Sequence, residues 1–251
     1  MRGKLLRVGL RLLGPLLLLV VLWRIDHKDA LWDALRGADG LLLLGAATLN
    51  AGNIHLKVLR WRVLLDARGF SFSNRQAWKA ILPSMYVGML TPGRVGDVLR
   101  VQYTRHEADV PYAEGLAVVV MDRFCDLYVL LAFVAAGVAH FASVLAGDLG
   151  RLTWIGVILT ALAPLLFLVR GPADRLFEGI YARIAKEKSP DGARRFLLAL
   201  RAQLGRRLLY TVPLTVGAFL LQYVQGFIAA RALGMNIGFV DVMFMLAIAS
   251  L

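Results

Sequence analysis

The sequence LTPGRVGDVLR, residues 90–100, decides how this chain is arranged, because it interrupts the apolar stretch between two basic regions. Pro92 and Gly93 end a helix, and residues 95–101 are able to begin another. The apolar stretch itself, residues 81–92, is shorter than the ~20 residues that a helix needs to cross a membrane. The pattern therefore predicts a broken helix.

On either side of this segment lie apolar runs long enough to be membrane helices. The chain has 251 residues, of which 59% are hydrophobic and 18% charged, and its mean hydropathy is +0.65. Outer-membrane barrels have short alternating segments instead. The composition predicts an all-α fold, a polytopic bundle of membrane helices that forms a single domain over residues 1–251. The predicted membrane helices are residues 10–23, 41–59, 118–141, 152–169 and 208–230.

The placement of the charges predicts how these helices are oriented. A net charge of +12 can indicate nucleic-acid binding. Here the cations lie between the apolar runs, as the bias toward positive cytoplasmic loops predicts, so we expect no nucleic-acid partner. Basic residues within 2–11 place the N-terminus in the cytoplasm, and the acid-rich stretch 24–39 is expected outside, with a short interfacial helix at 30–35. The loop 170–207 holds ten Lys or Arg against four acids and is predicted to be cytoplasmic.

The same orientation limits how often the chain crosses the membrane after Arg75. Counting back from the loop 170–207, the helix 118–141 begins on the cytoplasmic side, where Arg75 also lies, so the number of crossings between them is even. Two full crossings do not fit in residues 81–92. Residues 76–110 are therefore predicted to form a re-entrant element, whose helix N-terminus suits an anion. An ordinary cytoplasmic loop is the alternative.

Two stretches that follow long helices resemble each other. Residues 68–78 and 233–243 each contain a glycine, a short polar link and an amphipathic start, at Gln76 and at Asp241. On the predicted orientation the first copy starts at the inner face and the second at the outer face. Such an inverted repeat places a transport site near the midplane of the membrane. The second copy stops at Leu251, before a matching re-entrant turn, so we expect the chain to be truncated there.

Charged residues also occur inside the predicted helix 118–141. Asp122 and Asp126 share one face at i,i+4 spacing, and Arg123 is within i,i+3 reach of Asp126. A charge costs about 2.5–3.5 kcal/mol at the centre of a membrane helix, so these residues should face protein or water. Two interpretations stay open: a functional one, as a partner for the cations of the re-entrant element or as a relay, and a structural one, as an ion-pair clasp that holds helices in register.

The remaining polar features predict structural roles. Arg60-Trp61 is typical of an interfacial anchor, and its arginine is also able to meet a lipid phosphate. Asn50 and Asn53 predict hydrogen bonds between helices, and Gln222 and Gln225 are expected to face the interior of the bundle. The four histidines lack metal-ligand spacing, and no catalytic or nucleotide-binding motif occurs. We therefore predict no enzyme activity, no metal and no cofactor.

Three of these motifs resemble the transmembrane region of bacterial lysylphosphatidylglycerol synthases and their stand-alone relatives, the flippase-like membrane proteins. The first is Arg60-Trp61. The second is PGRVGDVLR at 92–100, where the family typically reads Pro-Gly-Arg-x-Gly-Glu-x-x-Arg, and the third is DRxxD at 122–126, typically Glu-Arg-x-x-Asp. Asp97 and Asp122 thus stand where Glu is usual, and the family's later motif rich in Pro and Gly is absent.

The resemblance implies a flippase-like lipid translocase in the cell (inner) membrane of a bacterium or archaeon. Its substrate would be a phospholipid or polyprenyl-linked lipid, and a lipid-modifying transferase its partner; the transferase domain of the full synthases is absent. The headgroup phosphate is expected at the re-entrant turn. A scaffold that anchors a transferase and a membrane-embedded lipid transferase remain alternatives. The expected ligand-binding residues are Arg60, Gly93, Arg94, Asp97, Arg100, Asp122, Arg123 and Asp126.

Overall fold

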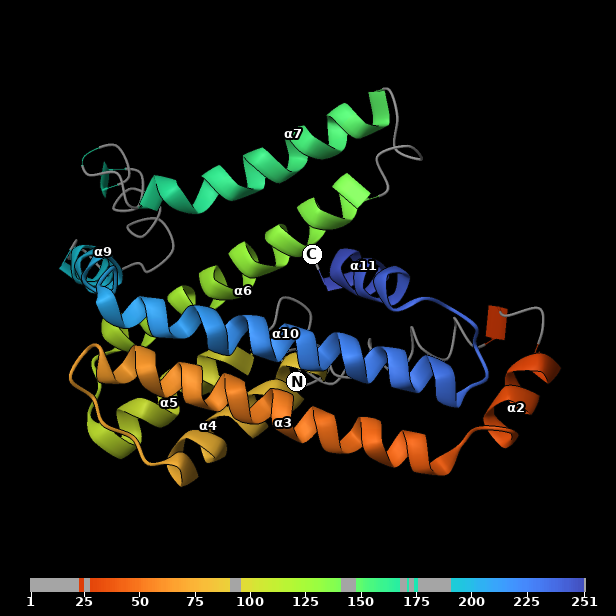
Figure 1. The fold of residues 1–251 in the computed structure, drawn as a ribbon. Coiled ribbons are helices and arrows are strands. Elements are labelled where there is room, and N and C mark those ends of the chain that lie inside the picture. The colour runs from red at the N-terminus through yellow and green to blue at the C-terminus, as the bar shows by residue number, and fades with distance from the viewer. Residues whose placement is uncertain are drawn as a thin grey trace, which may run out of the picture.

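The structure of the protein is a computed structural model. It describes residues 23–24, 28–90, 96–140, 148–167, 171, 174–175 and 191–250. Within these ranges the regular structure is helical, without a strand, which confirms the predicted all-α class (Figure 1). The elements are α2 (Lys28–Arg36), α3 (Gly40–Asp66), α4 (Asn74–Leu90), α5 (Gly96–Ala108), α6 (Tyr112–His140), α7 (Asp148–Leu162), η2 (Ala163–Phe167), α9 (Asp191–Ala202), α10 (Arg206–Ala232) and α11 (Phe239–Ser250).

The membrane character of the fold is visible in its exposed apolar surface. Gly150–Phe167, which spans α7 and η2, and α10 are both long and apolar enough to cross a membrane. Only 6% of the first segment is buried inside the protein, so its leucine and isoleucine side chains point outward. A protein dissolved in water would not expose such a surface, whereas a bilayer covers it. α3 and α6, with 27 and 29 residues, are also long enough to cross, but charged residues interrupt their apolar sequence.

The predicted elements agree with most of the observed helices. α3 and α10 cover the predicted segments 41–59 and 208–230, and α2 contains the short helix expected at 30–35. α6, and α7 with η2, cover the described residues of the predicted segments 118–141 and 152–169, which are 118–140 and 152–167. The predicted helix 10–23 lies outside the described residues.

α3 and α10 form an antiparallel pair at the centre of the molecule (Figure 1). The N–H of Asp39, just before α3, donates to the carbonyl of Ala232 at the end of α10, with a distance of 2.9 Å. Further along, Arg60 Nη1 donates to Thr215 Oγ1 at 3.1 Å. The pair therefore runs side by side along its whole length, and it provides two walls for the site described below.

α4 and α5 pack against each other as a pair, called here the α4–α5 hairpin, and leave no room for a side chain at their closest point. A Cβ atom built on Gly96 would lie 2.0 Å from the carbonyl oxygen of Ser84 and 2.5 Å from the nitrogen of Gly88. One turn later Arg100 Nε donates to Ser84 Oγ at 2.9 Å. Glycine at position 96 thus lets the two backbones touch and fixes the direction in which Arg100 points.

The segments of the chain that precede and follow this hairpin are in contact with each other. Arg68, just after α3, donates from Nε and Nη2 to the two carboxylate oxygens of Glu114, in the first turn of α6, at 2.7 and 2.8 Å. These hydrogen bonds raise the pKa of Arg68. The bidentate pair ties the end of α3 to the start of α6, so residues 69–113 begin and end side by side.

The predicted basic loop 170–207 contains a packed helix. α9 lies within this range, and its residues Phe196, Leu197 and Leu200 are buried in the same apolar cluster as Trp61 and Leu65 of α3. α9 alternates these apolar residues with arginines at helical spacing, so one face packs on the protein while the other stays polar. The loop is therefore partly structured, and its place on the cytoplasmic side stays a prediction.

α3 and α10 also end in the same way. Gly69 and Gly234 both have a positive φ, 81° and 74°, and each follows a helix of 27 residues. The N–H of Phe70 donates to Leu65 O at 3.1 Å, and that of Met235 donates to Ala230 O at 3.0 Å. These are matching glycine-terminated helix ends. They lie in the two stretches whose sequences resemble each other.

Candidate functional site

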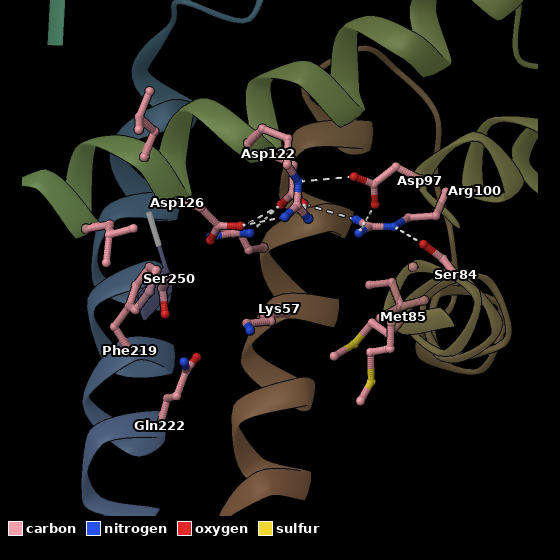
Figure 2. A pocket seen from close by; sticks show the side chains of 17 residues that line it. Lys57, Ser84, Met85, Asp97, Arg100, Asp122, Asp126, Phe219, Gln222 and Ser250 are labelled. Atoms are coloured by element: carbon pink, nitrogen blue, oxygen red, sulfur yellow. Dashed lines mark hydrogen bonds and ion pairs between the residues drawn. The ribbon is translucent and has the colours of Figure 1, made fainter. Parts of the chain in front are cut away.

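Six of the eight predicted ligand-binding residues meet in one network of charges between α3, α5 and α6 (Figure 2). They are three arginines and three aspartates: Arg60, Arg100, Arg123, Asp97, Asp122 and Asp126. The other two, Gly93 and Arg94, lie outside the described residues, so their role stays a prediction.

Asp122 is the centre of the network and one of its most buried members, with 2% of its side chain exposed. Its Oδ1 accepts from Arg60, at 2.8 Å from Nε and 2.7 Å from Nη2. Its Oδ2 accepts from Arg100 Nη1 at 3.0 Å and from Arg123 Nη2 at 3.1 Å. A single carboxylate thus binds three guanidinium groups from three helices. The interaction offsets the cost of burying each charge only as long as all partners remain.

The other two aspartates lie at the edges of this arrangement, each with 18% of its side chain exposed. Asp126 accepts from Arg60 Nη1 at 2.6 Å and pairs with Arg123 Nη1 at 3.2 Å. Asp97 accepts from Arg100 Nη2 at 2.6 Å, and its second oxygen lies 3.4 Å from Arg123 Nε. The i,i+4 spacing of the two α6 aspartates did predict their common face, and the structure adds Arg60 as the residue that binds both.

The network is balanced in charge. Its three arginines face three aspartates, and every one of these carboxylates is held by at least one arginine. These contacts fit the clasp interpretation of the charges in α6, and they also attach the α4–α5 hairpin to that clasp through Arg100. The clasp and the pairing of Arg100 with Asp122 are thus parts of one arrangement, whereas the re-entrant position of α5 in a membrane stays a prediction.

A cavity of about 570 Å³ adjoins the network. One wall is polar and includes the six charged residues, while other walls carry Met85, Met89, Leu127, Leu130 and Phe219. Gln222 lines it from α10, which agrees with its predicted place in the bundle interior. The cavity thus has a charged side and an apolar side, as a molecule with a polar head and an apolar body requires.

Sequence reasoning missed Lys57, which also lines this cavity. From the sequence, Lys57 is indistinguishable from the other basic residues that mark the predicted cytoplasmic end of the helix 41–59. Its spacing from Arg60, three residues along α3, was the available signal, because side chains at i and i+3 share a helix face.

The prediction that Arg60-Trp61 is an interfacial anchor is wrong. Both residues are only 1% exposed. Arg60 is buried in the charge network, and Trp61 packs on Phe72 with ring centroids 5.8 Å apart. An interfacial residue needs one side open to lipid and water, whereas α4, α6 and α9 cover this part of α3.

Nothing in the described part of the chain is arranged as a metal site: no three His, Cys, Asp or Glu side chains are placed to share an ion. His55 instead accepts a hydrogen bond from Trp78 Nε1 at 3.3 Å, and its ring stacks on the indole. The three aspartates of the network face arginines, which occupy the positions a cation would need.

The chain was compared with known proteins. Residues 10–251 match the family described as the lysylphosphatidylglycerol synthase transmembrane (TM) region. The glycosyltransferase AglD of Haloferax volcanii is 27% identical over 148 residues, which are 59% of this chain and 23% of AglD. The matched part is thus less than a quarter of that protein. No solved structure matches the chain. Because the family match covers nearly the whole sequence, this protein belongs to the membrane protein family defined by the transmembrane region of lysylphosphatidylglycerol synthases.

Proposed function

We propose that this protein is a lipid translocase that holds an anionic or lipid-linked headgroup in the cavity beside the charge network. The observation that carries the proposal is the two-sided cavity of about 570 Å³, charged on one side and lined by methionine, leucine and phenylalanine on others. A polar headgroup crosses a bilayer only where protein replaces its hydration, and a cavity among membrane helices supplies such a place.

The action proposed is binding and movement, without covalent chemistry. A general base needs a carboxylate free to take a proton. The carboxylates of Asp97, Asp122 and Asp126 are each bound by arginine, so they serve to fix the guanidinium groups. The family supports an association with membrane lipids, and phospholipids or polyprenyl-linked lipids are the proposed substrates.

A scaffold function is the second candidate, and the similarity to AglD favours it specifically. That relative is described as a glycosyltransferase, and the matched segment is under a quarter of its length. A segment of this kind is able to anchor a lipid-modifying transferase in the membrane. Such a scaffold would bind its partner enzyme but would not move lipid by itself.

The proposal includes a re-entrant α4–α5 hairpin. Two contacts support it: the Arg68–Glu114 pair, which brings the ends of residues 69–113 together, and the Gly96–Ser84 approach, which packs the start of α5 against α4. A segment that starts and ends side by side crosses a membrane an even number of times. The N-terminus would then be cytoplasmic, as the charge distribution predicts, in a cell membrane.

The proposal also includes an inverted repeat that relates α3 to α10 by a shift of 165 residues. A methyl group on Gly52 would lie 3.4 Å from Leu221 Cδ1, and one on Gly217 would lie 3.2 Å from Leu56 Cδ1. The shift takes 52 to 217 and 56 to 221, so the two contacts exchange partners as a twofold axis requires. The matching helix ends at Gly69 and Gly234 obey the same shift.

Filling the cavity tests the translocase proposal. A Cβ on Gly88 meets nothing within 4 Å, yet Gly88 lines the cavity, so Gly88→Leu is expected to fold and to occupy the headgroup space. In proteoliposomes with fluorescent phospholipid, transbilayer movement by the variant should fall to the rate of protein-free vesicles. Gly45→Leu is the matched control, because Gly45 is also helical with open space around it but lies outside the cavity. Equal rates for Gly88→Leu and the wild type would refute transport through this cavity, and no movement by the wild type would favour the scaffold.

Cysteine labelling tests the re-entrant hairpin. Arg75 and Glu107 are exposed residues near the two open ends of the hairpin, and His140 ends α6. With Cys125 replaced by alanine, we expect Arg75→Cys and Glu107→Cys to react with a membrane-impermeant maleimide from the same side of the membrane. His140→Cys should react from the opposite side, because the 29 residues of α6 are long enough to cross. Labelling of positions 75 and 107 from opposite sides would exclude a re-entrant element.

A further inference from the structure

The cavity holds one cation more than it holds carboxylates, within the residues that the structure describes. Four lining residues are basic and three are acidic. Six of these seven form the balanced network around Asp122. Lys57 is the seventh.

Lys57 stands apart from that network although it is on the same helix as Arg60. Over the described ranges of the chain, no hydrogen bond or ion pair joins its ammonium group to another residue. Figure 2 shows Lys57 extending from α3 into the cavity, with no dashed line to it. The arginines, by contrast, direct their donors to Asp97, Asp122 and Asp126.

The difference decides which cation is available to a ligand. An anion that bound Arg60 or Arg100 would have to displace a buried carboxylate, which leaves that carboxylate without its partner. An anion that binds Lys57 breaks no hydrogen bond or ion pair among the described residues. Among the described residues the excess charge is a single unit, so a ligand with one net negative charge neutralises it. A zwitterionic ligand brings its own cation together with its phosphate, so it leaves the excess positive charge of the cavity uncompensated.

On the basis of the translocase proposal above, we propose that Lys57 is the anchor of the headgroup and that it selects lipids with one net negative charge, in the form of a singly charged phosphodiester. The network of arginines and aspartates then acts as the rigid wall against which the headgroup lies. This assigns the phosphate to α3 rather than to the turn before α5.

The opposite wall carries a neutral residue at the corresponding position. Gln222 of α10 is related to Lys57 by the same shift of 165 residues, and both side chains extend into one space (Figure 2). An amide donates and accepts hydrogen bonds, so Gln222 suits the hydroxyl groups of a headgroup. The cavity therefore has a cation, Lys57, on one side and a neutral residue, Gln222, on the other. Exchanging the two residues by substitution moves the positive charge from α3 to α10.

The test compares the binding of two fluorescent short-chain lipids, phosphatidylglycerol with one net negative charge and phosphatidylcholine with none, to the purified chain in neutral detergent. We expect the wild type to prefer phosphatidylglycerol by about tenfold, and Lys57→Gln to lose that preference. Lys57→Arg should keep it. In the exchanged variant, Lys57→Gln with Gln222→Lys, the preference should return, because the charge is again in the cavity. Lys79→Gln removes an exposed lysine outside the cavity and should bind both lipids as the wild type does.

The outcomes separate this inference from the proposed function. If Lys57→Gln keeps the wild-type preference, or if Lys79→Gln loses as much of it, the role of Lys57 is refuted while binding in the cavity stands. If Lys57→Arg keeps the preference for phosphatidylglycerol and the exchanged variant does not regain it, the position of the charge matters as well as its sign. That result supports Lys57 as the residue that binds the headgroup. If Gly88→Leu binds both lipids as tightly as the wild type, the cavity is not the binding site, and the proposed function and this inference fall together.

Discussion

Asp122→Asn is expected to lower the free energy of unfolding by about 3–5 kcal/mol, the usual effect of removing one partner from a buried ion pair. The amide has nearly the shape of the carboxylate but carries no charge. It leaves Arg60, Arg100 and Arg123 facing only two aspartates, and its NH₂ group is directed either at the donors of Arg60 or at those of both Arg100 and Arg123. Denaturant unfolding of the purified protein in detergent micelles, followed by circular dichroism, measures the loss.

The matched control is Asp126→Asn, the same change on the same face of α6. Asp126 is 18% exposed at its side chain against 2% for Asp122, and it binds two arginines instead of three. Asp126 is less buried and has fewer partners, so the loss of stability should be clearly smaller. Equal losses for the two variants, or a stable Asp122→Asn protein, would contradict the central position assigned to Asp122.

Gly96→Ala is expected to cost about 3 kcal/mol, at the upper end of the range for an overpacked core. The added methyl group would lie 2.0 Å from the carbonyl oxygen of Ser84 and 2.5 Å from the nitrogen of Gly88. Both are backbone atoms, which no rotamer change can move, so α5 must shift away from α4. The shift would also lengthen the hydrogen bond between Arg100 and Ser84, now 2.9 Å.

Gly88→Ala provides the comparison on the other helix of the hairpin. A Cβ on Gly88 meets nothing within 4 Å, so the methyl group fits without movement. Alanine in a helix interior is favoured over glycine by up to about 1 kcal/mol, and the variant should unfold at the same or a slightly higher denaturant concentration. If both alanine variants were equally stable, the close approach of α4 and α5 at Gly96 would be refuted.

The helices were predictable because each apolar run is long and its ends are marked by charge. The runs 41–59, 152–169 and 208–230 needed no knowledge of their neighbours, since a membrane helix satisfies its backbone hydrogen bonds within itself. The common face of Asp122 and Asp126 followed from helical spacing alone. The all-α class and the family membership were therefore available from the sequence.

The contacts between distant segments were not predictable in this way. Arg60 and Asp122 are 62 residues apart, and nothing in either segment indicates the other as its partner. Arg60-Trp61 resembles an interfacial anchor until α4, α6 and α9 are packed on it. Lys57 resembles a cytoplasmic cation for the same reason. Arg94 and Gly93 stay predictions, as do the depth of the hairpin and the identity of the lipid.

The equal number of positive and negative groups around Asp122 has a consequence for the divergence of related sequences. A replacement that deletes one of these charges leaves its counterpart stranded, so single replacements should be selected against. The substitutions that persist should be paired ones, in which an aspartate and an arginine on different helices are both replaced by neutral residues. Relatives lacking Arg100, for example, are expected to lack an aspartate on α5 or α6 as well, and an alignment of the family would reveal this as covariation.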